Sequence, residues 1–190
     1  MSIDLPAFAD PVHGAQTCFR AVLDAMSRPG TVCSIGLGLT PPAPLAQAAA
    51  AVLLTLVDGE TALSLAPYFA PATDWIAFHC GAGLAEPDTA AFVLAVTLPD
   101  LAAVAQGSDD APQDSATIIL QVPSLAGSTR YRLTGPGIET EAILAVDGLP
   151  PDFAKRWAAN HALFPRGVDL ILCAGDRLAA LPRSVFVGEI

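Results

Sequence analysis

Three short apolar runs place the tightest constraint on the fold of this chain. They are AFVLAVT at Ala91–Thr97, TIILQV at Thr117–Val122 and VDLIL at Val168–Leu172. Successive side chains of a strand point to opposite faces of its sheet, so a strand without polar alternation must be covered on both faces. The runs therefore predict a buried sheet with a layer of further structure on each side.

Amphipathic and apolar segments supply the expected helices. Asp10-Pro11 pairs a favourable N-cap with a proline that fits the first helical turn, and Pro29-Gly30 ends the same segment. Four apolar residues of this helix recur at helical spacing, so we expect them to be buried together on one face. They are Phe19, Val22, Leu23 and Met26.

The remaining pattern is typical of an α/β protein. A second helix is expected at Leu45–Leu56, where nearly uniform apolarity predicts burial on several sides, and a more polar helix from Pro150 to about Ala162. Further strands are expected at 31–35, 62–65, 129–133, 178–181 and 184–187, the last two as edge strands, with a strand or helix-to-strand junction at 75–79. The sequence predicts one α/β domain over residues 1–190, with a mixed sheet between helical layers.

Charge and hydropathy exclude two classes of partner. The formal net charge is -10 and only nine residues are basic, whereas affinity for a phosphate backbone needs clustered Lys and Arg. The longest apolar helix candidate, Leu45–Val57, is shorter than the ~20 residues that cross a bilayer. We therefore expect no nucleic acid and no membrane as partner. The hydrophobic fraction of 53% suggests apolar surface that another protein covers.

Cysteine and histidine spacing predicts no metal site, and we also expect no cofactor in this chain. The four cysteines are far apart without a C-x-x-C pair, and the three histidines lack H-x-H or H-x-x-x-H spacing. The first residues, MSIDLPAFADPVHG, carry no basic region before an apolar one, so no signal peptide is expected. These features favour a cytoplasmic protein with reduced thiols.

The stretch RYRLTGPGIE contains the residues that we single out as a contact site. Arg130 and Arg132 are two positions apart on an expected strand, so they project from one face, and guanidinium groups suit phosphate or carboxylate recognition. Gly135 and Gly137 follow directly, either as a phosphate cradle or as a bend in the chain. We name these four residues as a speculative contact site for a ligand or another subunit.

The bend is favoured over the cradle. A dinucleotide fingerprint needs a third glycine where this chain has Thr140, and Pro136 lacks the amide hydrogen that a cradle would donate. Internal ion pairs are also the commoner use of arginines in so acidic a chain.

No other residues form a convincing catalytic set, so we predict no catalytic residue. His79 and Cys80 are adjacent, and on a strand they would point to opposite faces. A nucleophile would then need a distant base such as His13 or His161. The only lysine, Lys155, lies in the most polar helix and is expected to be solvated. Two readings stay open, a non-catalytic subunit of an assembly and a small independent enzyme that binds a phosphate ester or nucleotide through Arg130 and Arg132.

Several stretches, in this order and spacing, resemble the H subunit of the bacterial carbon–phosphorus lyase system for phosphonate use. The resemblance runs from about Pro11 to Val187. The stretches are FRAVLDAMSRPG at 19–30, VLLTLVDGET at 52–61, FHCG at 78–81, ATIILQV at 116–122, LTGPGIE at 133–139, FPRGVDLIL at 164–172 and LPRS at 181–184.

This resemblance implies a function and a set of partners. The family implies a homodimer when isolated and membership of a cytoplasmic core complex with the G, I and J subunits. That system is linked to forming ribose 1-phosphonate 5-triphosphate from ATP and a phosphonate, and the J subunit, a radical iron–sulfur enzyme, later cleaves the carbon–phosphorus bond. It also implies a three-layer αβα sandwich similar to pyridoxal-phosphate-dependent transferases but lacking their cofactor site.

The sequence departs from the family pattern in a few places. FHCG has Cys80 where we expect threonine or another small polar residue, which leaves the role of this thiol in doubt. The segment before Trp75 is short. The polar, turn-rich stretch GSDDAPQDS at 107–115 is expected to be a mobile surface loop.

Overall fold

A six-stranded mixed sheet forms the centre of the computed structural model, which describes residues 4–36 and 38–190. Residues 1–3, the start of the segment examined for a signal peptide, lie outside the described residues. The strand order is β1-β8-β7-β4-β3-β2; strands β2, β3, β4 and β7 run parallel, and β8 and β1 are antiparallel to their neighbours. The strands are β1 Cys33–Ser34, β2 Leu63–Leu65, β3 Phe92–Ala95, β4 Thr117–Gln121, β7 Asp169–Ala174 and β8 Arg177–Leu181.

The three apolar runs form the middle of this sheet, as predicted. Along β4, Ile118 and Ile119 are both fully buried although they point to opposite faces. Ile119 belongs to the hydrophobic core on one face of the sheet. Ile118 belongs to a second hydrophobic core on the opposite face. The sheet is therefore covered on both sides, as strands without polar alternation require.

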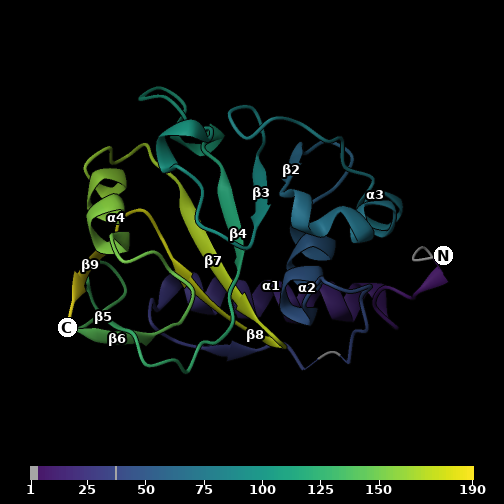
Figure 1. The fold of residues 1–190 in the computed structure, drawn as a ribbon, viewed down its shortest axis with the longest axis horizontal. Coiled ribbons are helices and arrows are strands. Elements are labelled where there is room, and N and C mark those ends of the chain that lie inside the picture. Colours follow the sequence, from purple (N-terminus) through teal and green to yellow (C-terminus); the bar gives the residue numbers. More distant parts are fainter. Residues whose placement is uncertain (1–3, 37) are drawn as a thin grey trace.

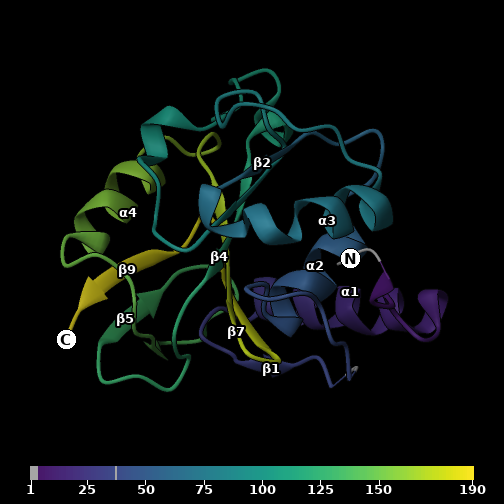
Figure 2. The ribbon, with the colours of Figure 1, turned by 45° about the vertical axis from the view of Figure 1, so that its right-hand side comes forward.

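Helices α1 (Pro11–Ser27), α2 (Gln47–Leu56) and α3 (Thr73–Cys80) cover one face (Figures 1 and 2). Asp10 caps α1 as expected, because its carboxylate accepts hydrogen bonds from the amides at the helix start. No side chain within helix α2 caps its N-terminus. Instead, the side-chain oxygen of Gln121 in β4 accepts a hydrogen bond from the amide of Ala46, which precedes the helix. The central part of α2 is buried on several sides, as predicted.

The other face is covered by helix α4 (Phe153–His161) and a second, three-stranded antiparallel sheet. Its order is β6-β5-β9, and Figure 2 shows β9 lying between α4 and β5. The bounds are β5 Arg130–Thr134, β6 Ala142–Ala145 and β9 Phe186–Glu189. The expected mixed sheet is thus confirmed, but the layer on this side is part helix and part sheet. Of the described residues, none belongs to a helix with the length and apolarity that a bilayer span needs.

Two of our strand predictions are wrong in part. The segment 75–79 lies in helix α3, not in a strand; six residues of 3-10 helix at Pro67–Ala72 lead into it, and Gly81 in the left-handed conformation ends it. Strand β8 is not an edge strand, because the two residues of β1 pair with its outer side.

The buried face of α1 is also rotated from the predicted one. The buried residues are Gly14, Cys18, Val22 and Ala25, whereas Phe19 is 45% exposed and Leu23 is 51% exposed. The helix therefore carries an apolar arc wider than its own fold covers.

The predicted bend after β5 is present. Gly135 has φ +131° and Gly137 has φ +80°, and the turn at Gly137 packs against the end of α1. A Cβ atom on Gly137 would overlap the carbonyl oxygen of Ser27, whereas one on Gly175 would have open space around it.

Gly137→Ala should therefore destabilise the fold more than Gly175→Ala. Both positions have positive φ, which costs an alanine about 1–2 kcal/mol, and only Gly137 adds a clash with backbone. We expect a loss above about 3 kcal/mol for Gly137→Ala, measured by urea unfolding. Equal losses in the two variants would contradict the close packing of this turn.

Candidate functional site

Arg130 and Arg132 project from one face of β5, as predicted. Tyr131 and Leu133 alternate with them and are buried in the core beneath. The Nε atom of Arg132 lies 3.3 Å from Oε2 of Glu141 in an exposed ion pair. Arg130 is exposed and, among the described residues, makes no ion pair or side-chain hydrogen bond.

The four residues singled out from the sequence do not converge on one site. Arg130 begins β5, and Gly135 and Gly137 lie beyond its other end, about 16 Å away at the rise of a strand. A hollow of about 460 Å³ lies beside Arg130, and Glu189 is among its lining residues. A carboxylate in this position disfavours a bound phosphate. A contact role for these four residues stays a prediction.

The cysteine and histidine candidates are also separated by the fold. Cys80 is buried on α3, and burial raises the pKa of its thiol to about 11. The imidazole of His79 instead donates to the carbonyl oxygen of Leu5 at 3.2 Å. The two side chains do not form a thiol–imidazole couple, although they lie on a helix and not on the strand we expected. No three possible metal ligands gather anywhere in residues 4–36 and 38–190.

A hollow of about 640 Å³ lies between α4 and the 3-10 turn Leu101–Ala103. Its only basic side chain, Arg156, is held by Asp152 at 2.9 Å. Lys155 on the same helix is exposed, as predicted.

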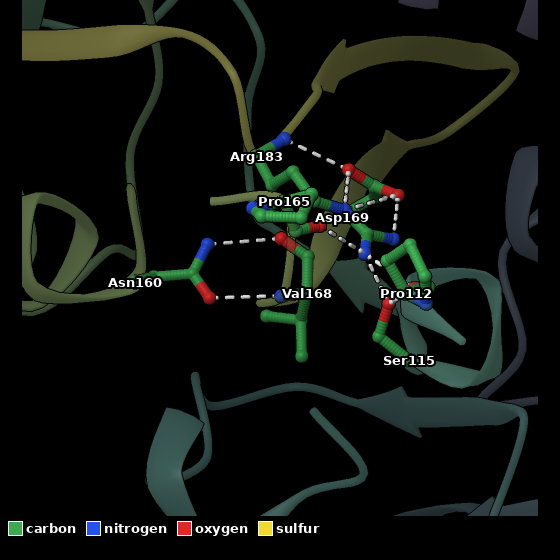
Figure 3. Close-up of polar contacts among 7 residues, drawn as sticks. All are labelled: Pro112, Ser115, Asn160, Pro165, Val168, Asp169 and Arg183. Atoms are coloured by element: carbon green, nitrogen blue, oxygen red, sulfur yellow. Dashed lines mark hydrogen bonds and ion pairs between the residues drawn. The ribbon is translucent and has the colours of Figure 1, made fainter. Parts of the chain in front are cut away.

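The most extensive polar network is one that the sequence analysis missed (Figure 3). The guanidinium of Arg183 meets the carboxylate of Asp169 at the start of β7, with Nη2 2.6 Å from Oδ2 and Nε 3.1 Å from Oδ1. The backbone amide of Arg183 also donates to Oδ1 at 2.7 Å. The side chains are only 15% and 22% exposed, so this is the most buried ion pair of the described residues.

Arg183 also joins segments that are distant in the sequence. Its Nη1 donates to the carbonyl oxygen of Pro112 at 2.8 Å and to the hydroxyl of Ser115, so the end of the expected surface loop is anchored here. The carbonyl oxygen of Arg183 accepts from Nδ1 of His161 at 2.9 Å. Because each guanidinium nitrogen already has a partner, Arg183 is an anchor and not an open binding group.

The side chain of Asn160 fixes the backbone at Val168, just before β7, through two hydrogen bonds. Its amide accepts from Val168 N at 2.8 Å and donates to Val168 O at 2.9 Å (Figure 3). The only signal for this network in the sequence was the presence of FPRGVDLIL and LPRS among the familiar stretches, which contain Asp169 and Arg183.

Arg183→Ala should strongly destabilise the fold, because it leaves the largely buried carboxylate of Asp169 without its partner. We expect a loss of roughly 2–4 kcal/mol. Arg156→Ala, which breaks an exposed pair, should cost at most about 1 kcal/mol. Thermal and urea unfolding of both variants measure the difference, and equal stabilities would refute the anchoring role.

Cys80 should make stability fall at alkaline pH. Burial raises the pKa of this thiol to about 11, from the 9.0 of an exposed cysteine. Stability from this group is complete below pH 9 and is lost as the pH rises toward 11, because the unfolded chain ionises first. In urea unfolding followed from pH 8 to 10.5, Cys80→Ala should lose about 2 kcal/mol less than the unsubstituted chain. Parallel pH curves would contradict this.

Comparison with known proteins agrees with the resemblance. The sequence model of the family described as "Bacterial phosphonate metabolism protein (PhnH)" matches residues 6–188. The chain is 41% identical over 184 residues to the Rhizobium meliloti (strain 1021) protein named alpha-D-ribose 1-methylphosphonate 5-triphosphate synthase subunit PhnH, covering 94% of this chain and 92% of the relative.

A second relative is the Stutzerimonas stutzeri protein named putative C-P lyase subunit protein HtxG. It is 37% identical over 173 residues, which cover 90% of this chain and 85% of the relative. Because the family match and both alignments span nearly the whole sequence, this chain belongs to the bacterial phosphonate metabolism protein (PhnH) family.

Proposed function

We propose that this chain is a non-catalytic, dimerising subunit of the carbon–phosphorus lyase core complex in the cytoplasm. The complex that it joins would form ribose 1-phosphonate 5-triphosphate from ATP and a phosphonate, with the G, I and J subunits as partners. Both relatives are named as subunits, which supports the role in an assembly. The observation that carries the dimerising role is the exposed apolar stripe of helix α1.

The α1 stripe consists of Val12, Phe19 and Leu23. Their spacings of seven and four residues place them along one side of the helix. All three are large, apolar and between 45% and 64% exposed. They flank the buried residues Cys18 and Val22, so the apolar surface of α1 continues beyond the part that its own fold covers. Another surface that covers this stripe would remove it from water.

The stripe suits a second copy of the same chain. Two copies that each carry a formal charge of -10 repel one another over most of their surfaces. The three side chains of the stripe are uncharged, so two copies related by a two-fold axis bring apolar side chains together without placing like charges opposite each other.

We extend the proposal to the fold relationship and the cofactor. The mixed sheet with a layer on each face supports a likeness to pyridoxal-phosphate-dependent transferases. A lysine that forms a Schiff base is desolvated, whereas Lys155 is exposed on α4. This supports a chain that holds no pyridoxal phosphate. An independent enzyme that uses Arg130 and Arg132 is less favoured, because Glu141 and Glu189 lie beside them.

Phe19→Glu should dissociate the dimer, because it places a carboxylate in the centre of the α1 stripe. Light scattering after gel filtration should give two chains of 19.5 kDa for the unsubstituted protein and one for the variant. Phe78→Glu, at an exposed phenylalanine of α3, is the matched control and should stay dimeric. A monomeric unsubstituted chain, or a dimeric Phe19→Glu variant, would contradict the proposal.

Co-expression with the G, I and J subunits of the same bacterium tests the assembly. A single tag on this chain should recover all of them, and the isolated chain should not convert ATP and a phosphonate. Turnover by the isolated chain would overturn the non-catalytic role.

A further inference from the structure

We propose that the outer face of the three-stranded sheet docks a different subunit of the complex, one that presents carboxylates beside apolar side chains. This docking face consists of Arg130 and Arg132 of β5, Ile143 of β6 and Phe186 of β9. The inference rests on the proposed function and adds to it the surface that meets an unlike chain.

The strand register places these side chains on one face. Arg132 lies opposite Ile143 on β6 and opposite Gly188 on β9, and Thr134 lies opposite Phe186. Directly opposed residues of antiparallel strands project to the same side. The alternate residues of β5, which include Leu133, fill the core on the inner side.

The apolar part of the docking face is open to solvent. Ile143 is 44% exposed and Phe186 is 56% exposed. Gly188 of β9, opposite Arg132, adds no side chain to this face, so a partner can approach the backbone there. Aromatic and arginine side chains together are the composition typical of residues that contribute most to binding.

Phe186 is held in place before any partner binds. Its ring lies 3.8 Å from the imidazole of His161, centroid to centroid, and that imidazole is fixed by the carbonyl oxygen of Arg183. Helix α4 lies along the edge of the sheet that β9 forms (Figure 2). A partner therefore contacts the face of this sheet and does not add a strand beside β9. A rigid anchor loses little conformational entropy on binding, which favours affinity.

The charges of the docking face favour a carboxylate on a partner's surface, because Glu189 lines the hollow beside Arg130 without forming an ion pair with it. Arg130 makes no ion pair within the described residues, although 19 acidic residues are available in the chain. The pair of Arg132 and Glu141 is exposed and 3.3 Å long, so it contributes little and its guanidinium can accept a second carboxylate. Two of only nine basic side chains thus stand together beside apolar residues.

The same charges disfavour a second copy of this chain on this face. Strand β5 is the central strand of the three, so Arg132 lies near the middle of the face. A two-fold axis through the middle would bring Arg132 against Arg132 of the other copy, and like charges in an interface are unfavourable. An unlike chain has no such restriction.

The test measures binding of the full chain to the purified assembly of the G, I and J subunits by biolayer interferometry. Arg130→Glu should weaken binding about tenfold or more, and Phe186→Ser should weaken it by a similar factor. Arg177→Glu is the matched control, because the side chain of Arg177 is exposed, makes no ion pair among the described residues and lies on the other sheet. It should bind within about twofold of the unsubstituted chain. Circular dichroism checks that each variant is folded.

The outcomes separate this inference from the function beneath it. Loss of binding in both docking-face variants while they remain dimers supports the proposal. Unchanged binding in both, an equal loss with Arg177→Glu, or dissociation of the dimer by Arg130→Glu would overturn the docking face alone. The same holds if inorganic phosphate binds through Arg130 while Arg130→Glu leaves subunit binding intact. If the unsubstituted chain does not bind the assembly, the proposed function and the docking face are both overturned.

Discussion

Burial of the central strands on both faces is the constraint from which the rest of this structure follows. Because β4 has no polar alternation, Ile118, Ile119 and Leu120 can leave water only if separate layers cover the two sides of the sheet. A chain of this length must then make two cores. Helix α2 achieves this on one side with a run of alanines, whose small side chains let it pack closely against its neighbours. The larger apolar side chains of the covering layers are in part left on the outside.

The same constraint explains which elements could be predicted from the sequence. A strand covered on both faces leaves a local signature, so β3, β4 and β7 were evident from their composition alone. Helix α3 has eight residues, too few to show a clear helical period, and its helical state depends on the core that buries Trp75 and Ile76. For α1 the period predicted a helix and an apolar arc, but not which part of the arc the sheet would cover.

For the candidate site, the sequence predicted local geometry and missed distant contacts. The common face of Arg130 and Arg132 follows from the two-residue period of a strand. The network around Arg183 instead depends on partners 14 and 71 residues away, Asp169 and Pro112, and no local pattern encodes such pairs. Two of the stretches that carry the family resemblance meet in this network. FPRGVDLIL contributes the carboxylate of Asp169, and LPRS contributes the guanidinium of Arg183.

The acidic charge of the chain bears differently on its two proposed contact surfaces, one for a second copy and one for an unlike chain. Like chains with a formal charge of -10 are stable together only where the contact itself adds no repulsion, and the uncharged stripe of α1 meets that condition. An unlike chain can be selected by charge, and the docking face supplies Arg130 and Arg132 for that purpose. The stripe belongs to the layer on one side of the central sheet and the docking face to the layer on the other. In the proposed arrangement, a second copy bound at α1 and an unlike chain bound at β5 therefore contact different layers of the fold.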